Sequence, residues 1–307
     1  GGFCEQRQPA LQASRKRSDG AGNTGDRGED EVRAVFRYPG SKWNLADWII
    51  GHFPEGYQNM VYLEPFLGSG AVFFNKLPGK VETINDLDSD IVNLFRVLRE
   101  QPEELKKALE LTPYSREEYD KSFEPCADPL EKARRYMVKT TQAIGAKLNG
   151  GKCGWRNHKQ MKIGGTACRW GGITETISIA AERLRGDTTH LVQIEHMDAL
   201  RLIERYNVPE ALIYLDPPYV LSSRKSGALY RYEMDNEGQK RLLELITRSR
   251  AKIILSGYEN ELYNTMLKGW FQDRTLSQTT STEKATEIIW MNYEPPCRQM
   301  KLGERLK

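Results

Sequence analysis

The sequence predicts an α/β protein with a mainly parallel sheet and one long insert. Short apolar runs alternate with helical patterns from Val35 onward, which is typical of a parallel sheet covered by helices. The alternation stops across residues 101–190 and then resumes. The chain has 307 residues, enough for one large domain or two ordinary ones. Its mean hydropathy is −0.63 and no apolar run approaches the roughly 18 residues that a bilayer requires, which argues against a membrane span.

The predicted strands are six short apolar runs. They are residues 60–66, 81–86, 191–196, 211–216, 252–258 and 286–293. Helical stripes lie between them, and the one that follows the second strand comprises Ile91, Leu94, Phe95 and Leu98. This alternation predicts helices on both faces of the sheet.

Three further segments divide the chain. Residues 1–34 lack apolar periodicity and balance six basic against six acidic side chains, so we expect a disordered leader, with a basic arm on nucleic acid as the alternative. Residues 101–187 exceed what a strand-to-helix connection needs, and we expect an inserted, smaller, mainly helical domain. Residues 35–100 and 188–300 then form the main domain, and residues 301–307 form a tail.

The positive charge of the chain is concentrated in the insert. The formal net charge is only +3, yet residues 132–174 carry ten cations and no Asp or Glu. Cations neutralise phosphates, and Trp155, Asn157 and Trp170 in the same stretch can stack on or read bases. We therefore expect the insert to bind nucleic acid, with a solvated structural face as the alternative. The cations assigned to this contact are Arg134, Arg135, Lys139, Lys147, Lys152, Arg156, Lys159 and Arg169.

The sharpest motif is Asp216-Pro217-Pro218-Tyr219, directly after an apolar strand. An Asp at the carboxyl end of a parallel strand points into the crevice where such sheets bind ligands. The prolines donate no backbone hydrogen bonds, so Asp216 and a carbonyl offer two acceptors to a planar amino group. Tyr219 offers an aromatic face on which a base can stack. The alternative is an Asp that caps an ordinary turn.

The second motif is Glu64-Pro65-Phe66-Leu67-Gly68-Ser69-Gly70, after the first strand. Glycines at this place let the backbone approach a bound nucleoside. A dinucleotide fingerprint requires a third glycine where Phe73 stands, so no pyrophosphate cradle is indicated. Asp86 ends the next strand and is placed to accept from ribose hydroxyls. Together these features favour a nucleoside cofactor without a diphosphate, such as S-adenosylmethionine.

The motifs, in this order, resemble those of the Dam-type adenine-specific DNA methyltransferases over about residues 36–293. The run Phe36-Arg37-Tyr38-Pro39-Gly40-Ser41-Lys42 is similar to the family's opening cofactor motif. The resemblance implies a Rossmann-like S-adenosylmethionine-dependent methyltransferase sheet and a target-recognition domain in the insert. The cofactor contacts that it implies are Tyr38, Lys42, Glu64, Phe66, Gly68, Gly70, Asp86, Asp198 and Asp216.

The resemblance also implies an activity. This is site-specific transfer of a methyl group from S-adenosylmethionine to adenine N6 in double-stranded DNA after base flipping, with Asp216, Pro217, Pro218 and Tyr219 as the catalytic box. Two alternatives stay open: a cytosine-N4 methyltransferase, in which Ser is common in place of Asp216, and a DNA-binding protein without activity. A nicotinamide-dependent dehydrogenase is disfavoured by Phe73. We expect a cytoplasmic, nucleoid-associated monomer, with a cognate restriction endonuclease as an optional partner.

The remaining motifs carry weaker expectations. Cys153, His158 and Cys168 lack a paired spacing, so we expect no metal site. Ser256-Gly257-Tyr258 ends a strand, and substrate contact and core packing are equally open for it. Residues 220–235 follow the catalytic box, and we expect them to order over the flipped base or its flanking phosphates, with a plain surface loop as the alternative.

Overall fold

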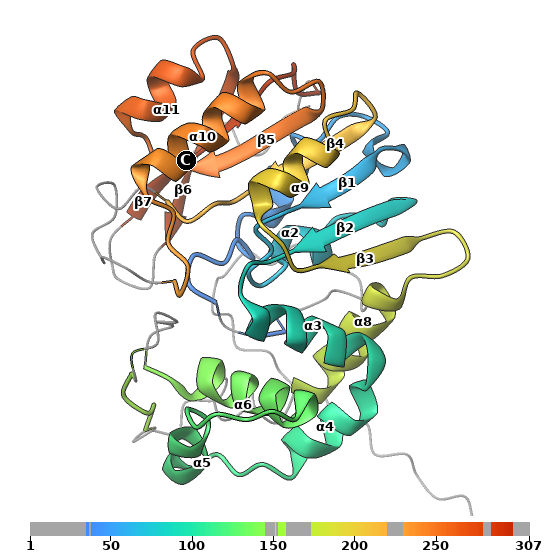
Figure 1. Ribbon diagram of the computed structural model, residues 1–307, viewed down its shortest axis with the longest axis vertical. Helices are drawn as coiled ribbons and strands as arrows, with labels where there is room; N and C mark the ends of the chain where they lie inside the picture. The colour runs from blue at the N-terminus through green and yellow to red at the C-terminus, as the bar shows by residue number, and fades with distance from the viewer. Residues whose placement is uncertain are drawn as a thin grey trace, which may run out of the picture. The chain divides into compact units, whose positions relative to one another are not determined.

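A mixed sheet of seven strands forms the centre of the described chain (Figure 1). The computed structural model describes residues 35–36, 38–144, 151, 153–157, 173–219, 230–278 and 284–296. The strands are β1 (Val61–Glu64), β2 (Val81–Asn85), β3 (Leu191–Glu195), β4 (Ala211–Leu215), β5 (Lys252–Gly257), β6 (Phe271–Gln278) and β7 (Lys284–Met291).

The strand order is β3-β2-β1-β4-β5-β7-β6. β1 to β5 pair in parallel, whereas β7 runs antiparallel to both β5 and β6. The order reverses between β1 and β4, and ligands bind in the crevice at the carboxyl ends of strands at such a point. The six predicted strands are confirmed within two residues at either end. β6 was not predicted, because this edge strand is polar and partly exposed and carries no apolar run.

Helices cover both faces of the sheet, as predicted (Figure 1). The helices are α1 (Ala46–Ile50), α2 (Ala71–Asn75), α3 (Ser89–Glu100), α4 (Pro102–Glu110), α5 (Arg116–Lys121), α6 (Pro129–Gln142), α8 (Ile173–Arg185), α9 (Ala199–Arg205), α10 (Asn236–Thr247) and α11 (Glu261–Met266). Tyr62 of β1 packs in a cluster with α1 to α3, whereas its neighbour Leu63 packs on the opposite face with α9 to α11. Successive side chains of a strand point to opposite faces, which explains the division.

The insert packs mainly against α3, and its helix α8 also contacts the edge strand β3. Figure 1 shows α4, α5, α6 and α8 grouped around the lower side of α3. Leu98 of α3, Leu105 of α4, Met137 of α6 and Ile177 of α8 are fully buried and belong to the same cluster as Tyr62. The insert and the sheet therefore share one continuous apolar core. The independent folding of residues 101–187 as a domain stays a prediction.

A buried ion cluster also joins the insert to the sheet. Glu82 of β2 is fully buried and pairs with Lys76, which follows α2, and with Arg183 of α8 at 2.5 Å. Charges at such depth persist only when paired, so the cluster fixes α8 against β2. Within the described ranges, no helix is both long and apolar enough to cross a bilayer.

Candidate active site

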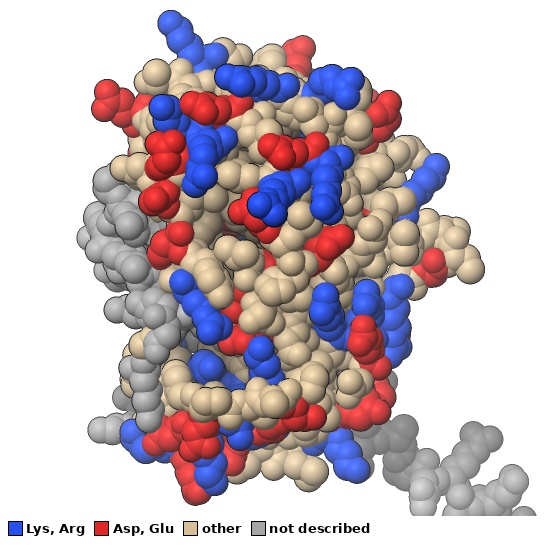
Figure 2. All heavy atoms as spheres, viewed as in Figure 1, with Lys and Arg blue, Asp and Glu red and all other residues tan. Residues whose placement is uncertain are grey.

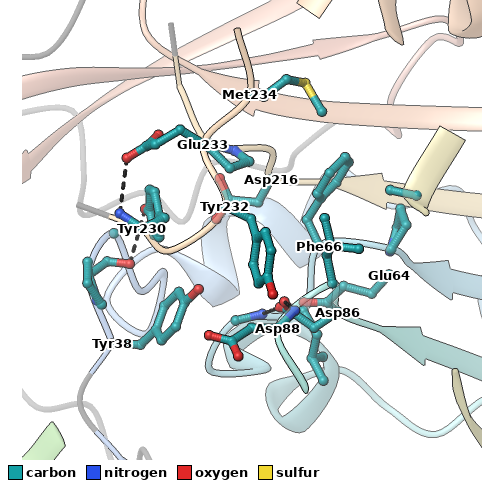
Figure 3. Close-up of a pocket in the computed structure, with 18 of the residues that line it drawn as sticks. Tyr38, Glu64, Phe66, Asp86, Asp88, Asp216, Tyr230, Tyr232, Glu233 and Met234 are labelled. Atoms are coloured by element: carbon teal, nitrogen blue, oxygen red, sulfur yellow. Dashed lines mark hydrogen bonds between the residues drawn. The ribbon is translucent and has the colours of Figure 1, made fainter. Parts of the chain in front are cut away.

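A cavity of about 340 Å³ opens at the carboxyl ends of β1, β2 and β4, where the strand order reverses (Figure 3). Five short segments line it: residues 38–42, 64–69, 86–88, 198–200 and 230–235, together with Asp216. The predicted cofactor residues that line it are Tyr38, Lys42, Glu64, Phe66, Gly68, Asp86, Asp198 and Asp216. Motifs that are far apart in sequence therefore meet in one place, as their positions at strand ends predict.

The glycine turn forms the floor of the cavity. Gly68 and Gly70 both have positive φ, 51° and 68°, a conformation that side chains other than glycine rarely adopt. A Cβ atom on Gly68 would lie 2.7 Å from the ring of Tyr38. Gly70 does not line the cavity itself but is the N-cap residue of α2, directly before Ala71. The turn therefore brings backbone, in place of side chains, against the space that a ligand would fill.

Three carboxyl groups of the cavity, Glu64, Asp86 and Asp88, have pKa values raised by burial, and the first two have contacts that suit a ligand. The buried Glu64 accepts a hydrogen bond from the Tyr62 hydroxyl at 2.7 Å, and burial raises its pKa to about 8. Asp86 accepts from the backbone N–H groups of Gly68 and Asp88, each at 2.9 Å. Burial outweighs these hydrogen bonds and raises the pKa of Asp86 to about 6. A ligand that donates hydrogen bonds or carries positive charge would therefore stabilise the ionised form of both Glu64 and Asp86.

Asp216 lies beside this cavity and is held by two side chains. The Ser256 hydroxyl donates to Asp216 Oδ1 at 2.8 Å, and Lys42 Nζ lies 3.2 Å from the same oxygen. Lys42 Nζ also donates to the Gly40 carbonyl at 2.9 Å and lies 3.3 Å from Glu287 Oε1. Burial would lower the pKa of Lys42, but the two carboxylates raise it above its ordinary value. The ammonium therefore stays charged, and it faces the catalytic box as well as the cavity.

Tyr219, the last residue of the box, is also anchored. Its hydroxyl donates to Glu287 Oε1. Its ring meets the ring of Tyr258 edge-on, with centroids 4.7 Å apart and an interplanar angle of 71°. The Lys42 ammonium lies 4.8 Å from the ring centroid. The orientation of this ring is thus set by three neighbours from three separate parts of the chain.

The carbonyl groups of the two prolines are not equivalent. The carbonyl of Pro218 accepts from Gln239 Nε2 at 2.6 Å, and Gln239 in turn accepts from the Tyr263 hydroxyl at 2.7 Å. Gln239 is fully buried on α10. The carbonyl of Pro218 is therefore already bonded within the protein.

Several residues at the site were missed or left undecided by the sequence analysis. Glu287 was missed, although an acid inside the apolar run of the last predicted strand was a visible signal. Ser256 and Tyr258, for which substrate contact and core packing were equally open, contact Asp216 and Tyr219 directly. Gln239 carried no signal, because its place opposite Pro218 depends on how α10 packs.

The segment at residues 230–235 covers one side of the cavity (Figure 3). Tyr230 donates to the Pro39 carbonyl at 3.2 Å, and Arg231 pairs with Asp88 and Asp90 at 3.5 and 3.2 Å. Figure 3 shows the ring of Tyr232 directed into the cavity. Residues 230–235 thus line the cavity, and residues 220–229 lie outside the described residues. Ordering of residues 220–235 over a flipped base or its flanking phosphates stays a prediction.

The cations predicted to contact DNA divide into two groups. Lys147, Lys152, Lys159 and Arg169 lie outside the described residues. Arg134 pairs with Glu131 at 2.6 Å and Glu118 at 2.8 Å, and Arg135 pairs with Glu131 at 2.7 Å. On the face in Figure 2, Lys and Arg side chains lie among Asp and Glu.

The other two described cations also contact the insert itself. Arg156 Nε donates to the Ala143 carbonyl at 3.2 Å, and Lys139 lies over the Phe123 ring at 5.2 Å. Contact of these cations with DNA stays a prediction. Of the predicted metal candidates, Cys153 is described and unbridged, whereas His158 and Cys168 lie outside the described residues.

A sheet of this order, with a glycine turn, an acid at the end of β2 and Asp-Pro-Pro-Tyr after β4, defines a Rossmann-like methyltransferase. The family model of the D12 class N6 adenine-specific DNA methyltransferases matches residues 38–284, and the chain belongs to this family.

Curated relatives agree with the family assignment. The chain is 26% identical over 291 residues to the Type II methyltransferase M1.LlaDCHI of Lactococcus lactis subsp. cremoris, covering 85% of this chain and 96% of that protein. It is 21% identical over 290 residues to the DNA adenine methylase of Salmonella typhi, covering 86% and 96%. Over 104 residues it is 30% identical to the DNA adenine methylase of Escherichia coli (strain K12), covering 30% and 36%.

These findings confirm the predicted enzyme class, which is methylation of adenine N6 in DNA. They favour adenine over the cytosine-N4 alternative and leave no ground for a dehydrogenase. Membership of this methyltransferase family implies S-adenosylmethionine as the methyl donor and DNA as the substrate.

Proposed function

We propose that this chain holds S-adenosylmethionine in the cavity at the ends of β1, β2 and β4 and methylates an adenine that is flipped out of double-stranded DNA. One observation carries the proposal: Asp216, in the box before Tyr219, borders the same cavity as Glu64 and Asp86. The amino group of a base and the cofactor would therefore meet at Asp216.

The residues of the cavity fit the cofactor. A volume of about 340 Å³ falls within the range of small-molecule sites. Asp86 would accept from the ribose hydroxyls, Glu64 would face the methionine ammonium, and Asp198 would lie near the adenine. Both Asp86 and Glu64 have raised pKa values, which is consistent with acids that lack the donors a ligand supplies. When bound, S-adenosylmethionine supplies a methyl group activated by a positively charged sulfur.

The catalytic box would hold the amino group of the target base. The N6 atom lies inside the base stack of a duplex, so the adenine must leave the helix to reach Asp216. Asp216 and the Pro217 carbonyl would accept the two amino hydrogens and turn the nitrogen lone pair out of the ring plane. Tyr219 would stack on the adenine ring. Positioning of this kind accounts for much of the rate enhancement of two-reactant enzymes.

The surrounding residues support Asp216 in this role. Lys42 and Ser256 both contact Oδ1, which holds this oxygen of the carboxylate in place. We assign Asp216 as a hydrogen-bond acceptor, because the amine needs to lose its proton only after the new bond has formed. A general-base role is not required by this geometry.

We further propose that residues 101–187 act as the target-recognition domain and that the enzyme works as a monomer. The excess of cations in residues 132–174 supports this role of the insert. A cognate restriction endonuclease is a further candidate partner, since one relative is a Type II methyltransferase by name.

The test is methyl transfer from tritiated S-adenosylmethionine to bacterial DNA that lacks adenine methylation, with nucleosides identified by mass spectrometry. We expect N6-methyladenine from the wild type and a loss of at least about 1000-fold in Asp216→Ala, with cofactor binding by calorimetry retained. Glu261→Ala, an exposed position on α11 outside the insert, serves as the control and should keep wild-type activity. Full transfer by Asp216→Ala would overturn the assignment, and N4-methylcytosine as the product would overturn the choice of base.

A further inference from the structure

Glu287 is a buried acid directly before the apolar end of its strand. It lies on β7, is 2% exposed and precedes four fully buried residues. Those residues are Ile288, Ile289, Trp290 and Met291. A carboxylate at such a position is costly unless it is paired and hydrogen-bonded, so its contacts need an explanation other than core packing.

The contacts of Glu287 lead to the catalytic box. Its Oε1 atom accepts from the Tyr219 hydroxyl and lies 3.3 Å from Lys42 Nζ. The same ammonium lies 3.2 Å from Asp216 Oδ1 and 4.8 Å from the centre of the Tyr219 ring. Glu287 therefore contacts Tyr219 directly and is linked to Asp216 through Lys42, and the proposed function places both Asp216 and Tyr219 against the target base.

The cluster restricts both catalytic side chains. A Tyr ring held only by its edge contact with Tyr258 can still swing about its Cα–Cβ bond. With its hydroxyl bound to a residue of the central sheet, the ring is fixed at both ends. The Lys42 ammonium is likewise held between two carboxylates, those of Glu287 and Asp216. A movement of the ammonium away from Asp216 would also break its contact with Glu287.

We propose that Glu287 is a positioning residue of the methyl-transfer site. By binding the Tyr219 hydroxyl and the Lys42 ammonium, it fixes the ring on which the target base stacks and holds Lys42 against Asp216. This inference rests on the proposed function, because it assigns a consequence for methyl transfer. Glu287 itself does not line the cavity and would touch neither the base nor the cofactor.

The test compares Glu287→Gln with Glu82→Gln. Both residues are buried glutamates of the sheet that pair with a lysine, but Glu82 contacts Lys76 and Arg183 and does not line the cavity. At saturating S-adenosylmethionine and DNA, we expect kcat to fall about 10- to 100-fold in Glu287→Gln, with cofactor affinity within about twofold of the wild type. Glu82→Gln should lower the melting temperature and leave kcat within about twofold for its folded fraction.

A second pair of variants keeps the proposal testable if Glu287→Gln folds poorly. Tyr219→Phe removes the hydroxyl that Glu287 accepts and keeps the ring, and we expect a loss of about 3- to 10-fold in kcat. When Glu287→Gln and Tyr219→Phe are combined, the fold-loss in kcat should be smaller than the product of the two single losses, because both changes break the same contact. A merely structural role would lower stability and leave this coupling absent.

The outcomes separate this inference from the proposed function. If the wild type makes no N6-methyladenine, the proposed function fails. If the wild type is active and either Glu287→Gln or Tyr219→Phe keeps wild-type kcat, the positioning role is overturned and the proposed function stands. Strictly multiplicative losses in the double variant would also overturn it.

Discussion

The ammonium of Lys42 lies 3.2 Å from the carboxylate of Asp216, which joins the opening motif of the chain to the catalytic box after β4. The side chains are 7% and 20% exposed, so water screens the pair only partly. Glu287 adds a second carboxylate at 3.3 Å from the same ammonium. One cation thus faces two carboxyl groups, the half-buried Asp216 and the buried Glu287, and this imbalance makes Lys42 sensitive to substitution.

Lys42→Met should therefore damage both stability and catalysis. Without the ammonium, Asp216 and Glu287 remain as two carboxylates beside each other, and breaking a buried pair costs about 3–5 kcal/mol. We expect a lower urea midpoint and a kcat reduced about 100-fold or more, measured at saturating cofactor. Lys240→Met is the control, since its pair with Glu244 is on the surface and contributes at most about 1 kcal/mol. Equal effects in the two variants would contradict the role of the buried pair.

Gly68→Ala should impair cofactor binding more than it impairs folding. The φ of 51° strains any other residue by about 1–2 kcal/mol, and the new Cβ would displace the Tyr38 ring that lies 2.7 Å away. Gly269→Ala carries similar strain at a φ of 92°, but its Cβ would meet nothing within 4 Å. Calorimetry should show a clear loss of S-adenosylmethionine affinity in the first variant alone. A matching loss in Gly269→Ala would mean that strain, not contact with Tyr38, weakens binding.

The strand ends were predictable and the contacts across the sheet were not. Glu64, Asp86 and Asp216 end apolar runs in sequence, and parallel strands bring such ends to one edge. Glu287 reaches the same site from the antiparallel strand β7. The local sequence of this strand does not predict that it lies between β5 and β6. For Ser256 the sequence left substrate contact and core packing equally open. Its contact with Asp216 depends on the pairing of β4 with β5, which the local sequence does not show.

The acids that pair with Arg134 lie outside the stretch of sequence that carries the excess of cations. Residues 132–174 contain no acid, but Glu131 stands one position before that window and Glu118 comes from the preceding helix. In the folded insert both carboxylates contact Arg134. The number of cations in residues 132–174 is therefore readable from the sequence. Which of these cations are neutralised by acids from outside that stretch depends on the fold.

The salt dependence of DNA binding should separate these cations. Each phosphate contact adds about 0.9 to the slope of log affinity against log salt concentration. Neutralising Lys152, Arg156 and Lys159 together should lower the slope by up to about 2.7. Arg134→Gln should leave the slope unchanged and reduce stability, because Arg134 is already paired with Glu118 and Glu131. A slope lowered by Arg134→Gln, or unchanged in the triple variant, would reverse the assignment of these residues.

Glu64 gives the ligand-free protein a stability that falls with pH. Its pKa is about 8 in the folded protein, against an ordinary value of 4.5, because it is buried. Between these values the folded state holds a proton that the unfolded state has lost, so the free energy of unfolding decreases as pH rises from about 4.5 through about 8. Glu64→Gln cannot titrate and should escape this loss.

The Gln variant should therefore match the wild type near pH 4.5 and exceed it by an amount on the order of 1–3 kcal/mol at pH 8, measured by urea denaturation without cofactor. Glu82→Gln provides the opposite sign. Arg183 and Lys76 overcome the effect of burial and lower the pKa of Glu82, so its carboxylate stabilises the fold above the ordinary pKa of a glutamate. If the stability difference between Glu64→Gln and the wild type does not change with pH, the pKa of Glu64 is not raised in the folded protein. Glu64 would then be ionised at neutral pH even without a bound ligand.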